Sequence, residues 1–254
     1  MDTAAAIATA ADLLRASHYG VGFTGAGIST PSGIPDFRSP KSGLWEDADA
    51  MRVASLQGFR QNPQRFYDWV RPLVAVTMLA KPNPAHIALA QLEQKGFLKG
   101  VITQNIDCLH SRCGSKIIYE VHGHLREATC ISCYRVHAAE ELFKQFLLDS
   151  QAPRCSHCGG WLKPNVILFG EQLPHKDWQG AKDAIRNADL VLIVGSSLVV
   201  APVCDLPRMA KAHGAKVIIV NLQPTDQDAM ADVVIHADAA VVLPAIVTCL
   251  EKSS

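Results

Sequence analysis

Four cysteines arranged as two CxxC pairs carry the strongest chemical signal in this sequence. The pairs are Cys130/Cys133 and Cys155/Cys158, separated by a segment expected to form a helix. Each CxxC turn directs two thiolates at one centre, and two such turns complete a tetrahedral zinc site. Because four protein ligands leave no open position, the pattern predicts one structural Zn²⁺ ion. Plain buried cysteines or a redox pair are the less favoured interpretations.

A glycine-rich run, GFTGAGIS at residues 22–29, ends the first expected strand. Its glycines would let backbone N–H groups approach a pyrophosphate, with a helix N-terminus behind them. The run departs from GxGxxG because Thr30 replaces the last glycine, and Gly-x-Gly alone also fits ordinary tight turns. The loop that follows ends in Asp36, Phe37 and Arg38 and is typical of a segment that covers a ligand. Simple stiffening of the loop is an alternative role for its prolines.

Polar side chains follow several further expected strands. Asn105 and Asp107, within TQNID, suit ribose hydroxyls and a carboxamide, although capping of a helix is an alternative. His122 also follows a strand, and histidine is the usual base near neutral pH, but a structural role is equally open. Residues 195–197 (GSS) and Asn221 end two more strands and suit contacts to a ribose or an adenine. In a doubly wound sheet, all these strand ends line one ligand crevice.

The elements that must position these residues are short β-branched runs alternating with helical segments. Near-continuous apolar runs suit parallel strands that are buried on both faces. The expected strands are residues 101–103, 117–119, 191–194, 217–220 and 233–235, and the expected helices include an Ala-rich N-terminal segment and residues 84–95, 138–148, 176–187, 203–212 and 239–250. This alternation predicts an α/β fold with a Rossmann-like, doubly wound parallel sheet.

Two stretches interrupt the alternation and suggest excursions from one sheet. Residues 39–81 contain helix-like pieces and no strong strand, so we expect a helical insertion that begins with a cofactor loop. Residues 125–163 contain the four paired cysteines and form the expected small zinc-ribbon domain. The Rossmann-like domain is then discontinuous and comprises residues 1–38, 82–124 and 164–254.

Composition narrows the class of protein. The 254 residues are 48% hydrophobic and 19% charged, with a formal net charge of zero, so a sizeable core is expected and a basic nucleic-acid footprint is missing. No apolar stretch reaches the roughly 18 residues that a membrane span requires, and the N-terminus lacks the pattern of a signal peptide. We therefore expect a cytoplasmic monomer that binds neither nucleic acid nor membrane.

Taken together, these motifs resemble the sirtuin family, most closely its prokaryotic members. The matching strings are GAGIST…SGIPDFRS, TQNID, HG, the two CxxC pairs, KPNVILFGE, GSSLVV and VN, in the expected order. They extend from about Gly22 to Asn221, nearly the whole chain. The resemblance implies an NAD-dependent enzyme that removes acetyl, and other short neutral acyl groups, from lysines of proteins or peptides.

In sirtuins the acyl carbonyl oxygen attacks the anomeric carbon of the nicotinamide ribose of NAD, nicotinamide leaves and an alkylamidate forms. Water then completes the reaction to free lysine and O-acyl-ADP-ribose. The resemblance implies that His122 is the general base and that Asn105 and Asp107 act with it by holding the ribose and the carboxamide. The cofactor-binding residues it implies are Gly25, Ala26, Gly27, Thr30, Asp36, Phe37, Arg38, Gln104, Asn105, Ile106, Asp107, His122, Gly195, Ser196, Ser197, Asn221 and Leu222.

The resemblance also implies an extended peptide clamped between two strands. The substrate-binding residues it implies are Tyr67, Ile167, Phe169, Gly170, Glu171, Leu198 and Val199. A plain core role is the alternative for Ile167 and Phe169, but their position between the zinc-binding segment and the returning sheet favours a substrate tunnel. Members that remove succinyl groups carry Tyr-x-x-Arg, whereas here Val70 stands where that arginine would be and Arg71 comes one residue late. We therefore favour neutral acyl groups over desuccinylation. Two other interpretations remain: a mono-ADP-ribosyltransferase that uses the same NAD site, and a zinc-ribbon binding module.

Overall fold

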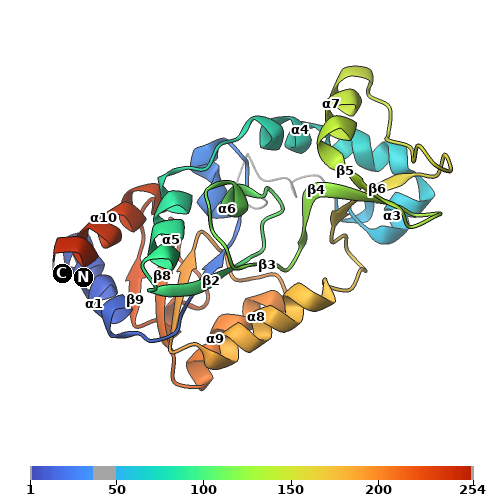
Figure 1. The fold of residues 1–254 in the computed structure, drawn as a ribbon. Coiled ribbons are helices and arrows are strands. Elements are labelled where there is room, and N and C mark those ends of the chain that lie inside the picture. The colour runs from blue at the N-terminus through green and yellow to red at the C-terminus, as the bar shows by residue number, and fades with distance from the viewer. Residues whose placement is uncertain (1, 37–49, 253–254) are drawn as a thin grey trace.

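A computed structural model describes residues 2–36 and 50–252 of the chain and divides them into a larger and a smaller part (Figure 1). The larger part is built on a six-stranded sheet in the order β3-β2-β1-β7-β8-β9, in which every pairing is parallel. The smaller part contains a three-stranded antiparallel sheet in the order β5-β4-β6. The predicted α/β architecture with a small second unit is confirmed.

The elements of the larger part follow the predicted alternation. Its strands are β1 (Gly20–Thr24), β2 (Leu98–Thr103), β3 (Ile118–Glu120), β7 (Leu190–Val194), β8 (Lys216–Val220) and β9 (Val233–Ile235). Its helices are α1 (Thr3–Ala16), α5 (Pro84–Gln94), α6 (Leu109–Arg112), α8 (His175–Asn187), α9 (Leu206–Ala212) and α10 (Ala239–Lys252), with the 3₁₀ helices η1 (Ala26–Ser32), η2 (Val203–Asp205) and η3 (Asp228–Met230). None of the helices described in the structure is long and apolar enough to cross a membrane.

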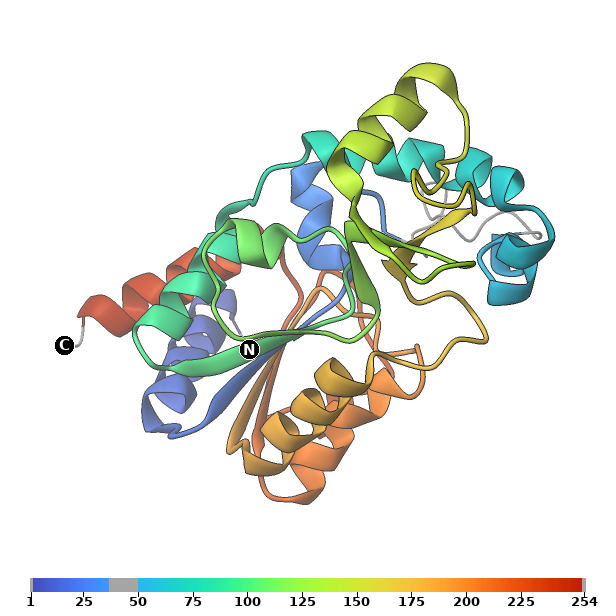
Figure 2. The same ribbon diagram turned by 45° about the vertical axis from the view of Figure 1, so that its right-hand side comes forward.

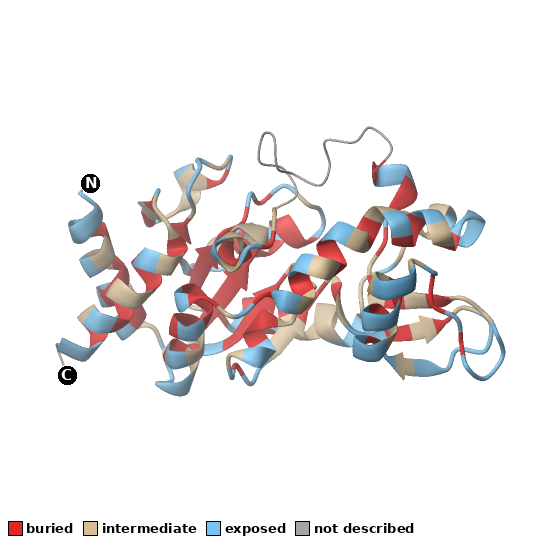
Figure 3. Cartoon of the chain, turned by 90° about the horizontal axis from the view of Figure 1, so that it is seen from above, coloured by how far each residue is buried: buried red, intermediate tan, exposed pale blue. Residues whose placement is uncertain are grey.

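Burial on both faces explains why the central strands are unbroken apolar runs in the sequence. Every residue of β1 and β7 is buried, because α1, α5 and α10 cover one face of the sheet and α8 and α9 cover the other (Figure 2). Seen from above, the buried strands form the centre of the larger part and the exposed residues lie on the outer helices (Figure 3). Apolar side chains on both faces are what a parallel sheet with crossover helices requires.

The segment after β1 differs from the expected helix. It forms the seven-residue 3₁₀ helix η1, with Pro31 inside it and Gly33 at its end with a φ of 85°. Proline lacks the N–H group that a continuing α-helix needs, and glycine adopts the left-handed conformation without strain. Helix α5 begins as predicted, because the side chain of Asn83 accepts a hydrogen bond from Ala85 N and Pro84 occupies the first turn.

The smaller part combines the helical insertion with the cysteine-containing segment. Its elements are α2 (Ala50–Val53), α3 (Leu56–Gln61), α4 (Pro63–Leu79), β4 (Gly123–Cys130), β5 (Val136–Ala138), α7 (Ala139–Asp149) and β6 (Leu162–Val166). Phe59, Phe66 and Tyr67 from the insertion share one hydrophobic core with Phe146 from α7. The two excursions from the sheet therefore pack against each other, a relationship that their separation in the sequence concealed.

Candidate active site and metal centre

The loops after β1 and β7 meet where the strand order reverses, which is where doubly wound sheets bind their ligands. Gly25 N donates a hydrogen bond to Val194 O at 3.2 Å, and Gly27 N donates one to Gly195 O at 2.8 Å. A Cβ atom on Gly27 would lie 2.9 Å from the Cα atom of Gly195, so the backbones could not approach this closely. The glycine run therefore serves first to bring two strand ends together at the crevice.

Ser29 is the centre of a buried polar cluster beside this crevice. Its hydroxyl donates to Asp107 Oδ2 at 2.7 Å and accepts from Asn105 Nδ2 at 3.1 Å. Asn105 Nδ2 also donates to Gly25 O at 3.2 Å, and Leu109 N donates to Asp107 Oδ1 at 2.9 Å. Burial raises the pKa of Asp107, while the bonds from Leu109 and Ser29 act in the opposite direction. The cluster fixes two of the three predicted catalytic side chains, Asn105 and Asp107, in one orientation.

His122 is held as a neutral base. Its Nδ1 atom lies 3.1 Å from Gln104 O, and a carbonyl oxygen only accepts hydrogen bonds, so Nδ1 carries the proton and Nε2 carries a lone pair. Burial lowers the pKa of His122, and the bond to Gln104 partly offsets this effect. Gln104 Nε2 donates to Ser196 Oγ at 2.9 Å, which links the end of β2 to the end of β7. The predicted base is therefore connected to both sides of the crevice.

Other predicted cofactor residues lie around the same crevice. Ala26, Ile106, Asn105 and Asp107 line one pocket with residues from η1 and α4, the further lining residues being Ser29, Ile34, Pro35, Leu73 and Thr77. Thr30 donates its hydroxyl to Gly27 O at 3.0 Å. Ser197 and Leu222 are exposed, and Asn221 is half-buried after β8. Phe37 and Arg38 lie outside the described residues, while Asp36 is the last residue described before them.

The predicted substrate segment continues from β6. Its residues alternate, with Val166 and Leu168 buried, Ile167 half-buried and Phe169 41% exposed. Ile167 N donates to His122 O at 2.9 Å, so this segment is attached directly to the residue that carries the imidazole. Neither Ile167 nor Phe169 is therefore a fully buried core residue, and their contact with a substrate stays a prediction.

The residues of the second predicted strand of the clamp, LVV, differ in how far they are exposed. Val199 is 55% exposed, whereas Leu198 is buried and has a left-handed φ of 55°. Gly170 is exposed, and Glu171 is half-buried with its carboxylate bound to Lys163.

Tyr67 does not belong to the ligand-facing surface. Its side chain is fully buried, and its hydroxyl donates to Leu162 O at 2.7 Å. Arg71 donates to Leu147 O at 2.7 Å and to the hydroxyl of Ser150, so its guanidinium is bound to the end of α7. The expectation that Tyr67 contacts the substrate is not met here, because a buried phenol must satisfy its hydroxyl inside the core.

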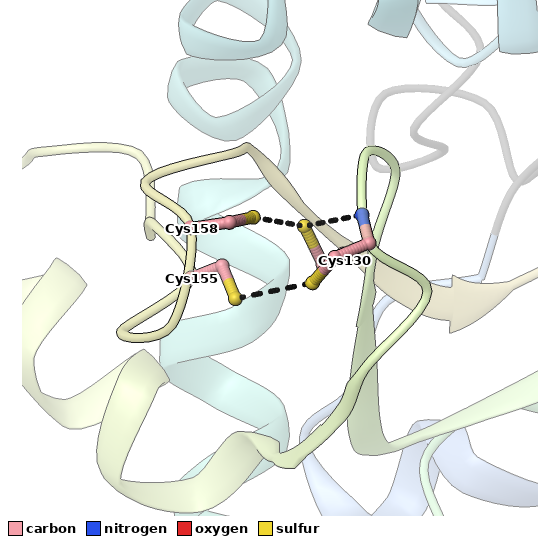
Figure 4. A group of neighbouring side chains, drawn as sticks. Cys130, Cys155 and Cys158 are labelled. Carbon is pink, nitrogen blue, oxygen red and sulfur yellow. Dashed lines mark hydrogen bonds between the residues drawn. The ribbon is translucent and has the colours of Figure 1, made fainter.

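The four predicted zinc ligands converge on one point in the smaller part. Figure 4 shows three of them, Cys130, Cys155 and Cys158, facing one another. The sulfur atoms of all four lie within 4.8 Å of one another. Cys130 Sγ lies 3.5 Å from Cys158 Sγ, and Cys133 Sγ lies 3.7 Å from Cys155 Sγ. Zn–S bonds of about 2.3 Å in a tetrahedron place the sulfurs about 3.8 Å apart. The donor set and its spacing therefore fit a structural zinc ion, with no position left for a substrate.

Sequence reasoning missed several residues that support the site. Ser29 stood within the glycine-rich run but was not assigned a role. His86 and His110 form a buried pair with ring centroids 5.0 Å apart, and His110 Nε2 lies 2.9 Å from Thr24 Oγ1. Lys163 lies at the start of the KPNVILFGE string. The partners of Ser29, His86 and His110 are distant in the sequence, and the pairing of Lys163 with the nearby Glu171 follows no regular helix or strand spacing.

Comparison with known proteins agrees with this arrangement. The model of the Sir2 family matches residues 25–202. NAD-dependent protein deacylase 2 of Archaeoglobus fulgidus is 45% identical over 242 residues, which cover 95% of this chain and 94% of that protein. NAD-dependent protein deacetylase 2 of Caldanaerobacter subterraneus is 43% identical and covers 96% and 95%, respectively.

Solved structures give the same result. One that concerns the mechanism and regulation of Sir2 enzymes has a TM-score of 0.91 and 43% identity, and covers 98% of this chain and 99% of that chain. A second, of a Sir2 protein with a p53 peptide and NAD, has a TM-score of 0.84 and 39% identity, and covers 95% and 96%. Fold and site thus define a doubly wound nucleotide-binding protein with a zinc ribbon. The chain belongs to the Sir2 family, the sirtuins.

Proposed function

We propose that this chain is an NAD-dependent protein-lysine deacylase that removes acetyl and other short neutral acyl groups. One observation carries the proposal: the imidazole of His122 is hydrogen-bonded to Gln104 O at the end of β2, while the backbone carbonyl of His122 accepts a hydrogen bond from Ile167 N of the predicted substrate segment. The base therefore lies between the nucleotide crevice and the segment along which an extended peptide would bind. The products are nicotinamide, O-acyl-ADP-ribose and free lysine.

The position of each residue determines its role in the proposed reaction. His122 Nε2 takes a proton from a ribose hydroxyl of NAD. Nδ1 keeps its own proton and donates it in a hydrogen bond to Gln104 O. Asn105 and Asp107 orient the nicotinamide ribose and the carboxamide, held in place by Ser29. The glycine-rich turn and residues 195–197 supply the surface for the phosphates and the adenosine. A peptide binds in extended form along the segment that contains Ile167, Phe169 and Gly170, and hydrogen bonds to its backbone provide affinity with little demand on sequence.

A neutral acyl group suits this site better than an acidic one. Val70 is buried, Tyr67 donates its hydroxyl to Leu162 O, and Arg71 is bound to Leu147 and Ser150. Arg71 is thus not presented beside Tyr67 to pair with a succinyl carboxylate, and an unpaired buried carboxylate is strongly disfavoured.

The test measures nicotinamide release from NAD by the native chain with an acetyl-lysine peptide, a succinyl-lysine peptide and no peptide. Deacylation predicts release that requires the acetyl peptide and yields equal amounts of free lysine and O-acetyl-ADP-ribose. Release without acyl-lysine, with label from NAD appearing on protein, would instead identify a mono-ADP-ribosyltransferase. Faster release with the succinyl peptide would contradict the neutral-acyl assignment.

The proposal includes a cytoplasmic, monomeric enzyme acting on proteins. All eight cysteines are free of disulfides, and four of them form the metal cluster, which suits a reducing compartment. Sedimentation of the zinc-loaded chain tests the monomer, since a dimer would have twice the mass of 27.5 kDa.

A further inference from the structure

The ammonium group of Lys163 is buried at the base of the substrate segment. Its side chain is 13% exposed, and that of its partner Glu171 is 16% exposed. Lys163 Nζ donates to Pro164 O at 3.0 Å, to Val166 O at 2.8 Å and to Glu171 Oε2 at 2.9 Å. An ammonium group has three N–H donors, so all of them are used. Burial lowers the pKa of Lys163, and the carboxylate of Glu171 opposes that shift.

Glu171 closes the same segment from its other end. Its Oε2 atom accepts a hydrogen bond from Leu168 N at 2.8 Å, and Glu171 N donates to Leu168 O at 3.0 Å. Gly170, with a φ of 86°, makes the turn that folds the carboxylate back. The ion pair therefore joins the carbonyls at the end of β6 to the turn that follows Phe169.

The residues between these anchors form the edge that carries Ile167 and Phe169. Two backbone hydrogen bonds attach this edge to the rest of the protein. Ile167 N donates to His122 O at 2.9 Å, and Phe169 N donates to Ala54 O at 3.0 Å. Without the ion pair, the turn at Gly170 would lose its carboxylate cap and the two carbonyls would lose their shared donor. The conformation of this segment relative to His122 thus depends on the contacts of Lys163 and Glu171.

Stability alone is a poor reason for such a pair, because apolar side chains of similar volume often stabilise a core as well as a buried ion pair does. Conformational specificity is a property that buried, fully hydrogen-bonded pairs supply in some proteins. We propose that Lys163 and Glu171 are positioning residues that set the conformation of residues 167–170 and thereby the affinity for the acyl-lysine peptide. This inference rests on the proposed deacylase function, and it changes the expected role of Glu171 from substrate contact to support of the segment.

The experiment compares steady-state kinetics of Glu171→Gln and of the double variant Lys163→Met/Glu171→Gln with the native chain, each loaded with zinc. The double variant leaves no unpaired buried charge, so it tests the idea even where the single variant folds poorly. We expect the KM for an acetyl-lysine peptide to rise about tenfold in both, with the KM for NAD within about twofold of native. Glu171→Asp, which keeps the charge, is expected to recover part of the peptide affinity.

The matched control is Asp183→Asn, which removes an exposed ion pair, Arg186 to Asp183 at 2.7 Å on helix α8. Its two KM values are expected to equal those of the native chain. A peptide KM within about twofold of native in the double variant overturns the inference, as does an equal rise in both KM values. Failure of the native chain to deacylate the peptide at all would instead count against the proposed function.

Discussion

Ser29 and Asp107 lie 78 positions apart in the sequence, yet a hydrogen bond of 2.7 Å joins their side chains beside the nucleotide crevice. Ser29 also accepts from Asn105, so one hydroxyl orients both polar side chains of the TQNID string. The 3₁₀ helix η1 after β1 and the loop after β2 are thereby locked together. This bond links the glycine-rich turn to the chemistry that the chain is proposed to perform.

Replacing Ser29 with alanine should weaken both folding and cofactor binding. The substitution leaves the buried Asp107 carboxylate without one donor, which should lower the free energy of unfolding by about 1–3 kcal/mol. Loss of the Asn105 orientation should raise the KM for NAD about tenfold. Urea unfolding and NAD titrations measure the two effects, with the exposed Ser111→Ala as control. A native KM for NAD in Ser29→Ala would contradict the assigned role.

His122→Ala should abolish most catalysis while the peptide still binds. General bases contribute about 10²- to 10⁴-fold to rates, so peptide-dependent nicotinamide release should fall by at least about 100-fold. The exposed His213→Ala, at the end of α9, serves as the matched control and should be fully active. If His122→Ala kept native turnover, another group would have to be the base.

Stability should decrease as the pH falls from about 6.5 toward about 4. Burial lowers the pKa of His86 to about 4, and burial together with the charge of His86 lowers that of His110 to about 3. Both titrate near 6.5 in the unfolded chain, so in this window the unfolded state binds more protons and the free energy of unfolding rises with pH. The slope is at most about 1.4 kcal/mol per pH unit for each histidine.

Urea unfolding at a series of pH values measures this slope. His110→Gln should reduce it by up to the share of one histidine, whereas the exposed His213→Gln should leave it unchanged. Equal slopes in the native chain and His110→Gln would show that the buried pair is not responsible.

Removal of zinc should disable the enzyme by unfolding the smaller part. Native protein is expected to contain about one zinc ion per chain, and Cys155→Ser should lose it. The cluster joins the end of β4 to the turn that precedes β6, and β6 leads directly into the substrate segment. Metal analysis, thermal unfolding and peptide-dependent activity check this prediction, with Cys249→Ser as control. Full activity of metal-free protein would contradict it.

Local sequence patterns predicted much of this protein. The apolar runs of β7 and β8, the cap of α5 at Asn83 and the two CxxC pairs are each readable from residues that are neighbours in the chain. These patterns can be interpreted from neighbouring residues alone, because strand burial, helix capping and the turn of a metal knuckle depend on short-range geometry. The strings around Asn105, Asp107 and His122 also located the candidate catalytic residues.

Only the tertiary structure decided which distant groups meet. It placed Tyr67 inside the core with its hydroxyl on Leu162 O, joined Ser29 to Asp107, and brought His86 beside His110. Such contacts depend on how the helical insertion and the zinc ribbon pack against the sheet. Buried polar groups must find partners wherever that packing brings them, so their roles are set by the whole fold and not by their neighbours in the chain.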